Sequence, residues 1–117
     1  MSKIIIEATT SYLAEDSVKA LLKGGFVAKS ARISYNINRG LPHPEDINLY
    51  PLVLEGLLNR SPVKVYVFSV TAGYGGTGPH AMVDILKAAG FQFNSDDILT
   101  DRSADSNRQI NLKYTRL

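Results

Sequence analysis

Hydrophobic and polar residues alternate along two segments of the chain, which predicts two half-buried strands. In residues 31–37 every second position is apolar, from Ala31 to Ile37. The same period of two returns in residues 109–114. Because successive side chains of a strand point to opposite faces, each segment would present one apolar face to a core. The two strands can pair with each other.

Continuous apolar runs predict two further strands. Ile4, Ile5 and Ile6 form a short β-branched run that is consistent with a short buried strand. Residues 63–70, VKVYVFSV, are almost continuously apolar. This pattern is typical of a central strand that is buried on both faces.

Helical spacing of apolar residues predicts three helices. The first covers residues 13–22, with Gly24 as the left-handed residue that ends it. The second begins at Pro51 and has an apolar face that includes Leu54 and Leu58.

The third helix begins at Pro79 and ends at Gly90, where Phe91 can pack back on Leu86. Residues 38–48 are expected to form an exposed loop, and residues 94–108 a loop with one helical turn. The order is β-α-β-α-β-α, then a loop and a strand. It predicts an α/β fold, in which a small mixed sheet has helices packed against it, although an α+β arrangement also fits.

Length and composition limit the classes of function that the protein can have. The 117 residues suit a single domain over residues 1–117. No cysteine is present, so thiolate metal sites and cysteine nucleophiles are excluded. The sequence shows no signal peptide or membrane span, which favours the cytoplasm and no membrane partner. With a net charge of +2 and interleaved signs, duplex nucleic acid is not an expected partner.

A glycine-rich turn joins the apolar run 63–70 to the third helix and is the main candidate for a binding site. Backbone N–H groups of such a turn can converge on an anion, assisted by the start of the helix. A hydroxyl and an aromatic ring lie in the same segment. Its residues are Gly73, Tyr74, Gly75, Gly76, Thr77 and Gly78. A phosphorylated ligand with a stackable base fits these groups, but tight connections also need glycine without any ligand.

Several side chains could add chemistry to this loop. His80 could contact a phosphate or act as an acid or base, or it could be a partly exposed residue of the helix start. His43 has the same alternatives in its loop. The carboxylate pairs Glu45 with Asp46 and Asp96 with Asp97 are more typical of loops and caps than of metal ligands. We expect no metal and no cofactor.

Arginine and aromatic side chains could hold the rest of a ligand. Arg60 and Arg108 are the preferred arginines for a phosphate. Phe91, Phe93 and Tyr74 could stack on a base, although Phe91 also suits the core. Asn94 could contact a ring edge or a ribose, or form a plain turn.

The segments SARISYN at 30–36, PHPEDIN at 42–48 and VTAGYGGTGPHAMVDILKAAGF at 70–91 resemble the first class of phage-encoded Thoeris anti-defence proteins. The resemblance covers roughly residues 24–99, and the glycine loop is its most distinctive part. It implies a homo-oligomeric sponge that holds a cyclised ADP-ribose immune signal without cleaving it. Some members of the family also bind cyclic di- or trinucleotides at a second site.

The resemblance also implies aromatic, asparagine and arginine side chains around the ligand. Phe91 or Phe93, Asn94, Arg60 and Arg108 are the nearest equivalents in this sequence. A donor-rich loop without a defined acid and base pair suits capture better than turnover. The expectation is therefore a protein of the infected bacterial cytoplasm that is not an enzyme. A small phosphodiesterase or nucleotide hydrolase that uses His80 is the main alternative, and an interaction protein without a small ligand is another.

Overall fold

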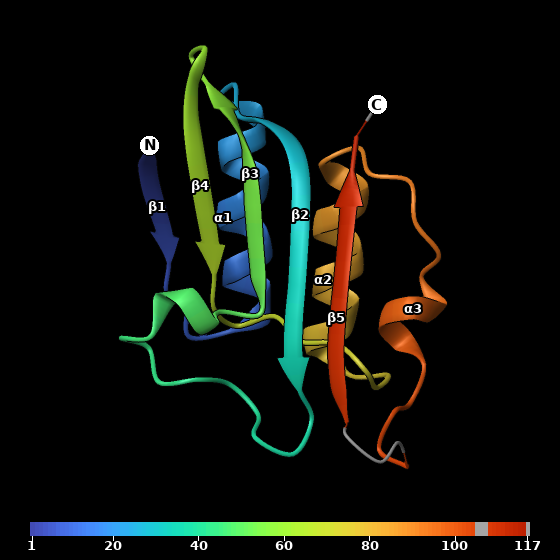
Figure 1. The fold of residues 1–117 in the computed structure, drawn as a ribbon. Coiled ribbons are helices and arrows are strands. Elements are labelled where there is room, and N and C mark those ends of the chain that lie inside the picture. Colours follow the sequence, from blue (N-terminus) through green and yellow to red (C-terminus); the bar gives the residue numbers. More distant parts are fainter. Residues whose placement is uncertain (105–107, 117) are drawn as a thin grey trace.

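The computed structural model describes residues 1–104 and 108–116, and this part of the chain builds one five-stranded sheet with helices (Figure 1). The strands are β1 (Ser2–Ile6), β2 (Val27–Asn36), β3 (Leu52–Leu58), β4 (Ser61–Val67) and β5 (Gln109–Thr115). The helices are α1 (Ser11–Lys23), α2 (Thr77–Ala88), the short α3 (Asp96–Leu99) and a 3₁₀ turn, η1 (Ile47–Leu49).

The sheet is mixed, as its pattern predicted. Its strand order is β1-β4-β3-β2-β5. Strands β1 and β4 are parallel, and every other neighbouring pair is antiparallel. The predicted pairing of the last strand with residues 31–37 is confirmed, because Ile33 lies opposite Leu112 and Tyr35 opposite Ile110.

Both long helices lie on one face of the sheet (Figure 1). That face carries the main core, in which cross-strand neighbours such as Ile33, Leu52 and Val67 are fully buried beneath α1 and α2. On the other face, Tyr50 covers Val53 and Tyr66 in a smaller apolar cluster. The chain between β2 and β3 therefore shields one end of the sheet face that the helices leave open.

The prediction of a helix from Pro51 is wrong, because residues 52–58 form strand β3. This strand pairs with β2 on one side and with β4 on the other, so it lies at the centre of the sheet. A two-residue turn at Asn59 and Arg60 joins it to β4, and both residues have positive φ angles of 51° and 68°. A two-residue turn with positive φ angles matches the twist of the two strands that it joins. The pairing of β3 with a strand on each side outweighs the helical preference that the spacing of its leucines suggested. The element order is β-α-β-β-β-α-α-β.

Strand β4 is an interior strand that pairs with β3 and with the edge strand β1, and its consecutive residues Val65, Tyr66 and Val67 are buried, as predicted for a strand buried on both faces. Strand β1 is less buried than its isoleucines suggested, because its Ile5 side chain is 47% exposed. An edge strand covered by helices on one face alone leaves alternate side chains in water. Among the described residues, no helix is long and apolar enough to cross a membrane.

The helix ends follow the predicted chemistry with small shifts in position. Gly24 has φ −79°, and Gly25, at φ 106°, is the left-handed residue after α1. At the end of α2, Gly90 is left-handed at φ 89°, and the Phe91 N–H donates to the Leu86 carbonyl. Both Phe91 and Leu86 belong to the main core. Helix α2 begins at Thr77, two residues before Pro79, so the proline lies within its first turn.

Candidate functional site

The parallel pair β1 and β4 places the starts of two helices at the same end of the sheet. Each strand leads into a helix, β1 into α1 and β4 into α2, and the two helices lie side by side (Figure 1). The loops between them are tied together. The Ser11 hydroxyl donates to the Ser69 carbonyl at 2.7 Å, and the Ser69 hydroxyl donates to the Ala8 carbonyl. Ligands in such sheets gather beyond the carboxyl ends of the strands, which is where these loops lie.

The first glycine of the loop is held firmly in place. The Gly73 N–H donates to the Ile98 carbonyl at 2.7 Å, and the Gly73 carbonyl accepts from Arg102 N at 2.9 Å. Its φ of 92° suits glycine, and an added Cβ would lie 2.3 Å from the Ile110 side chain. The loop is therefore anchored both to the sheet and to the segment around α3.

Tyr74 packs against its own loop. Its hydroxyl is 2.7 Å from the buried Thr71 hydroxyl. An added Cβ at Gly76 would lie 2.5 Å from the Tyr74 ring, and one at Gly78 would lie 2.1 Å from Thr71 Oγ1. Two of the glycines are thus needed to make room for Tyr74 and Thr71, which is the purely structural role of the loop glycines.

The loop nonetheless presents a row of free backbone donors. Within residues 1–104 and 108–116, the N–H groups of residues 74–78 donate to no protein acceptor, and the first bond of the helix is His80 N to the Gly76 carbonyl at 3.2 Å. The last three of these amides, at the N-cap Gly76 and at Thr77 and Gly78, form the positive end of the dipole of the 12-residue helix α2. They can bind an anion.

A groove with a volume of about 430 Å³ opens beside these amides, between α1 and α2. Its polar side chains come from both helices, and its residues are Tyr12, Glu15, Gly75, Gly76, Thr77, His80, Ala81 and Asp84. The His80 ring is fixed in it by a 2.9 Å hydrogen bond between Nδ1 and the Gly76 carbonyl. Since a carbonyl only accepts, Nδ1 donates in the neutral ring, and Nε2 is left as an acceptor.

The part of the groove that lies away from the glycine loop is acidic. Glu15 and Asp84 face it, and Glu15 is bound to Lys19 at 2.6 Å. The hydrogen bond from Lys19 to Glu15 raises the lysine pKa. An anion is therefore favoured at the loop amides and disfavoured beside the two carboxylates, which instead attract hydroxyl or amino groups.

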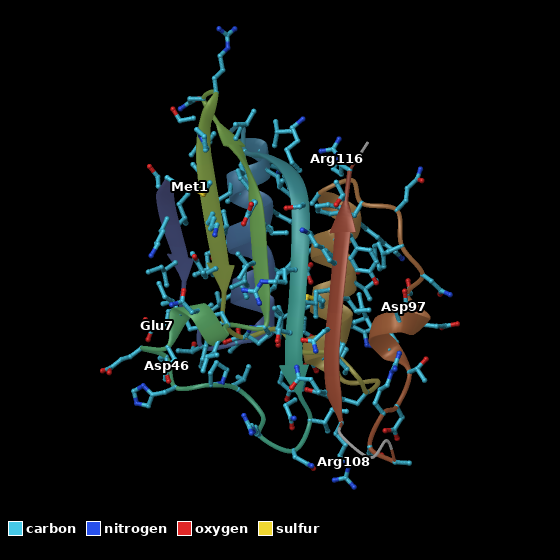
Figure 2. The ribbon with its side chains drawn as sticks, viewed as in Figure 1. Met1, Glu7, Asp46, Asp97, Arg108 and Arg116 are labelled. Atoms are coloured by element: carbon cyan, nitrogen blue, oxygen red, sulfur yellow. The ribbon has the colours of Figure 1, made fainter. Side chains whose placement is uncertain are left out.

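The two arginines preferred from the sequence lie at opposite ends of the sheet. Arg60 is exposed in the β3–β4 hairpin, at the end away from the glycine loop (Figure 1). Arg108 lies at the same end as the loop (Figure 2). Its Nη1 donates to the Asn38 side chain at 2.5 Å. The structure therefore places Arg108 at the loop's end of the sheet and leaves Arg60 apart, because Arg60 is part of the tight turn after strand β3 and does not end a helix.

Phe91, Phe93 and Asn94 have structural partners near the far end of α2. Phe91 is 6% exposed and belongs to the core, the alternative that its sequence context had suggested. The Phe93 ring packs against the Tyr114 ring, with centroids 5.6 Å apart. The Asn94 side chain accepts from Asp96 N at 3.0 Å, so it forms a turn that leads into α3.

The remaining polar candidates lie in the loop between β2 and β3 or, in the case of Asp96 and Asp97, in the first turn of α3. His43 is exposed, and its Nδ1 accepts from Glu45 N at 3.3 Å. Asp46 precedes η1, as a residue of a helix-entry turn would. In the described part of the chain, no group of three or more histidine, aspartate or glutamate side chains could hold a metal ion.

Three residues at the site escaped the sequence reasoning, and a fourth, Arg102, was a candidate arginine for a phosphate but not one of the two preferred. Tyr12, Glu15 and Asp84 line the groove because α1 packs against α2, and Arg102 lies beside the loop through its bond to Gly73. Where these residues lie in the folded protein depends on which strands of the sheet are parallel neighbours. The amphipathic faces of the two helices gave no signal for this, because the groove lies on their outer sides.

The contact between α3 and β5 predicts a change of stability in alkali. Burial, with a contribution from Asp97, raises the pKa of Tyr114 to about 12, and its hydroxyl donates to Asp97 at 3.2 Å. The folded state thus holds this proton more tightly than the unfolded chain, whose tyrosine pKa is about 10. The resulting stability is present below about pH 10 and is lost as the pH rises toward 12. Tyr114→Phe should lack this loss, so its free energy of unfolding, measured in urea, should approach that of the wild type across this range. If the free energies of unfolding of the two proteins differed by a constant amount across this pH range, the raised pKa of Tyr114 would be contradicted.

The candidate site consists of the loop 73–78, the first turns of α2 and the facing side of α1. It combines amide donors at one end with His80 Nε2 and two carboxylates at the other. This arrangement can hold an anion together with the hydroxyl groups of the same molecule. Comparisons of the chain with protein-family models, with curated proteins and with solved structures give no significant match.

Proposed function

We propose that this protein binds and sequesters a small cyclic nucleotide immune signal, of the cyclic ADP-ribose isomer type, without cleaving it. The observation that carries the proposal is the row of five amides at residues 74–78, which donate to no acceptor in the described part of the chain and lie beside a groove of about 430 Å³. Free donors at a helix start favour a phosphate. The resemblance of the glycine segment to phage Thoeris anti-defence proteins supports the choice of signal and a role in an infected bacterial cell, as a homo-oligomer.

The charges of the groove suggest how such a ligand would lie. A phosphate would sit on the loop amides, at the end away from Glu15 and Asp84. The ribose hydroxyls would then donate to these carboxylates and to His80 Nε2, whose free lone pair is fixed by the bond from Nδ1. Arg108 would add positive charge from the same end of the sheet. Each group of the site thus meets a ligand group of complementary chemistry.

Capture requires no chemical step, and His80 is the one group that argues for a different function. Its Nδ1 is oriented by the Gly76 carbonyl, so Nε2 could act as a base in a small phosphodiesterase. That orienting bond favours this second candidate. A backbone carbonyl, however, orients the ring without stabilising the imidazolium as a carboxylate would. We therefore place capture first.

The amount of product formed under excess ligand separates the two functions. The protein is mixed with cyclic ADP-ribose isomers in large excess over binding sites. It is then separated from the free ligand and denatured, and the nucleotides are analysed by chromatography. We expect uptake of one ligand per site and release of the intact molecule. His80→Ala should weaken uptake modestly and produce no new species.

Multiple turnovers that disappear in His80→Ala would contradict capture and would make His80 a catalytic residue, since loss of a true acid or base costs roughly a hundredfold or more in rate. Absence of any bound nucleotide from both proteins would contradict both functions. It would favour an interaction protein without a small ligand.

A further inference from the structure

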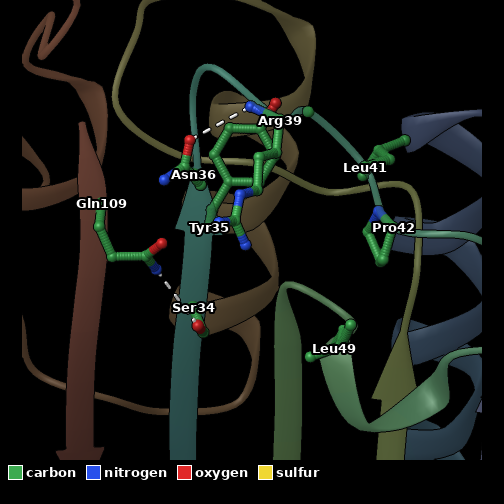
Figure 3. Close-up of a pocket in the computed structure, with 9 residues that line it drawn as sticks. Ser34, Tyr35, Asn36, Arg39, Leu41, Pro42, Leu49 and Gln109 are labelled. Carbon is green, nitrogen blue, oxygen red and sulfur yellow. Dashed lines mark hydrogen bonds between the residues drawn. The ribbon is translucent and has the colours of Figure 1, made fainter. Parts of the chain in front are cut away.

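A second pocket lies on the sheet face away from the long helices, and it plays no part in the proposed function. It is enclosed by the chain that leaves β2, by η1 and by the start of β5 (Figure 3). Its volume is about 170 Å³. The residues that line it are Ser34, Tyr35, Asn36, Arg39, Gly40, Leu41, Pro42, Leu49 and Gln109.

One side of this pocket is polar and carries a single charge. The Arg39 side chain runs from the loop back along β2 toward Ser34 (Figure 3). Among the described residues, its guanidinium makes no ion pair or hydrogen bond. Gln109 lies beside it, with its Nε2 donating to the Ser34 hydroxyl at 3.4 Å.

The opposite side is apolar and open to water. Leu41 is 40% exposed and Leu49 is 63% exposed, and Pro42 lies between them in the wall. Two exposed leucines at the mouth of one pocket favour an apolar group of a ligand above them. Among the described residues, no carboxylate lines the pocket, so no acidic side chain of residues 1–104 and 108–116 in its wall compensates the charge of Arg39.

We propose that this pocket binds a small monocarboxylate that carries one aromatic ring or a short branched apolar group. The planar guanidinium of Arg39 matches a carboxylate through two parallel N–H donors. Leu41 and Leu49 would cover the apolar group. The volume is close to that of an engineered cavity of about 150 Å³ that holds benzene, so a single ring fits and a nucleotide does not. The proposal is independent of the nucleotide site, because it shares no residue with it.

Benzoate is a suitable probe, and benzyl alcohol is its uncharged counterpart. Amide chemical shifts are recorded by two-dimensional NMR while each compound is added to the 117-residue chain. Saturable shifts with benzoate should be confined to residues 34–42, 49 and 109–111, and benzyl alcohol should bind at least roughly tenfold more weakly, since a charge-assisted pair is lost. Phenyl phosphate should not exceed benzoate in affinity.

Variants identify the two sides of the pocket. Arg39→Gln should weaken benzoate binding roughly tenfold or more and bring it close to that of benzyl alcohol. Leu49→Ser should weaken both compounds. Arg60→Gln, which removes another exposed arginine from the distant hairpin, should change neither.

The proposal would be overturned by shifts outside this pocket, by equal binding of benzoate and benzyl alcohol, or by tighter binding of phenyl phosphate. It would also fail if Arg39→Gln and Arg60→Gln lowered the affinity equally, because a general charge effect would then explain the binding. All three substituted side chains are exposed, so unchanged spectra elsewhere show that the fold is intact.

Discussion

Replacement of Gly56 by alanine is expected to lower the free energy of unfolding by about 3 kcal/mol or more. Gly56 lies in the central strand β3, where an added Cβ would be 2.0 Å from the Val27 carbonyl oxygen and 2.9 Å from Ala28 Cα. Both atoms belong to the backbone of β2, at an irregularity of the β2–β3 pairing. A strand cannot move aside as a flexible side chain can, so the pairing of the two strands must change.

Chemical denaturation measures this loss, and Gly75→Ala is a matched control. An added Cβ at Gly75 meets no atom within 4 Å, so the same substitution there should change stability by less than about 0.5 kcal/mol. At about 4 °C per kcal/mol for a domain of this size, Gly56→Ala should also lower the melting temperature by more than about 10 °C. Equal stability of the two variants would mean that β2 and β3 pair differently.

The same strand shows where sequence reasoning failed. Residues 52–58 read LVLEGLL, in which leucines fall at helical spacing but nearly every residue is also apolar, as in a buried strand. Gly56 at the centre of the segment argues weakly against a helix. The turn after it uses Asn59 and Arg60 rather than the Asn-Gly pair that signals a hairpin. Only pairing with β2 and β4 decides between the two structures, and pairing is not a local property.

The candidate site likewise has one part that the local sequence predicts and another part that depends on the pairing of distant strands. The loop from Gly73 to Gly78 could be predicted because glycine, proline and a helix start act over neighbouring residues. The facing residues Tyr12 and Glu15 could not, since they come from a helix about 60 positions earlier that reaches the loop only through the parallel β1–β4 pair. Arg60 was misplaced because its segment was assigned to a helix.

Gly75 also allows the strongest test of the loop as a phosphate site. It lines the groove, has no positive φ and has open space around it, so a valine there should leave the fold intact. Because Gly75 lines the groove beside the loop amides, the two methyl groups of the valine would occupy space next to them and hinder the close approach that a phosphate needs. We expect the affinity for cyclic ADP-ribose isomers, measured by calorimetry, to fall at least about a hundredfold, which corresponds to about 2.7 kcal/mol.

The other loop glycines are less informative, because an added Cβ at Gly76 or Gly78 collides with Tyr74 or Thr71 and would disturb the loop itself. Gly75→Val should keep the melting temperature of the wild type, so that lost binding is not lost folding. Gly75→Ala, with one methyl group, should retain more affinity than the valine variant. Undiminished binding in Gly75→Val would exclude the loop amides as the phosphate site even if the protein binds nucleotides elsewhere, for a ligand held by these amides cannot tolerate a branched side chain between itself and its donors.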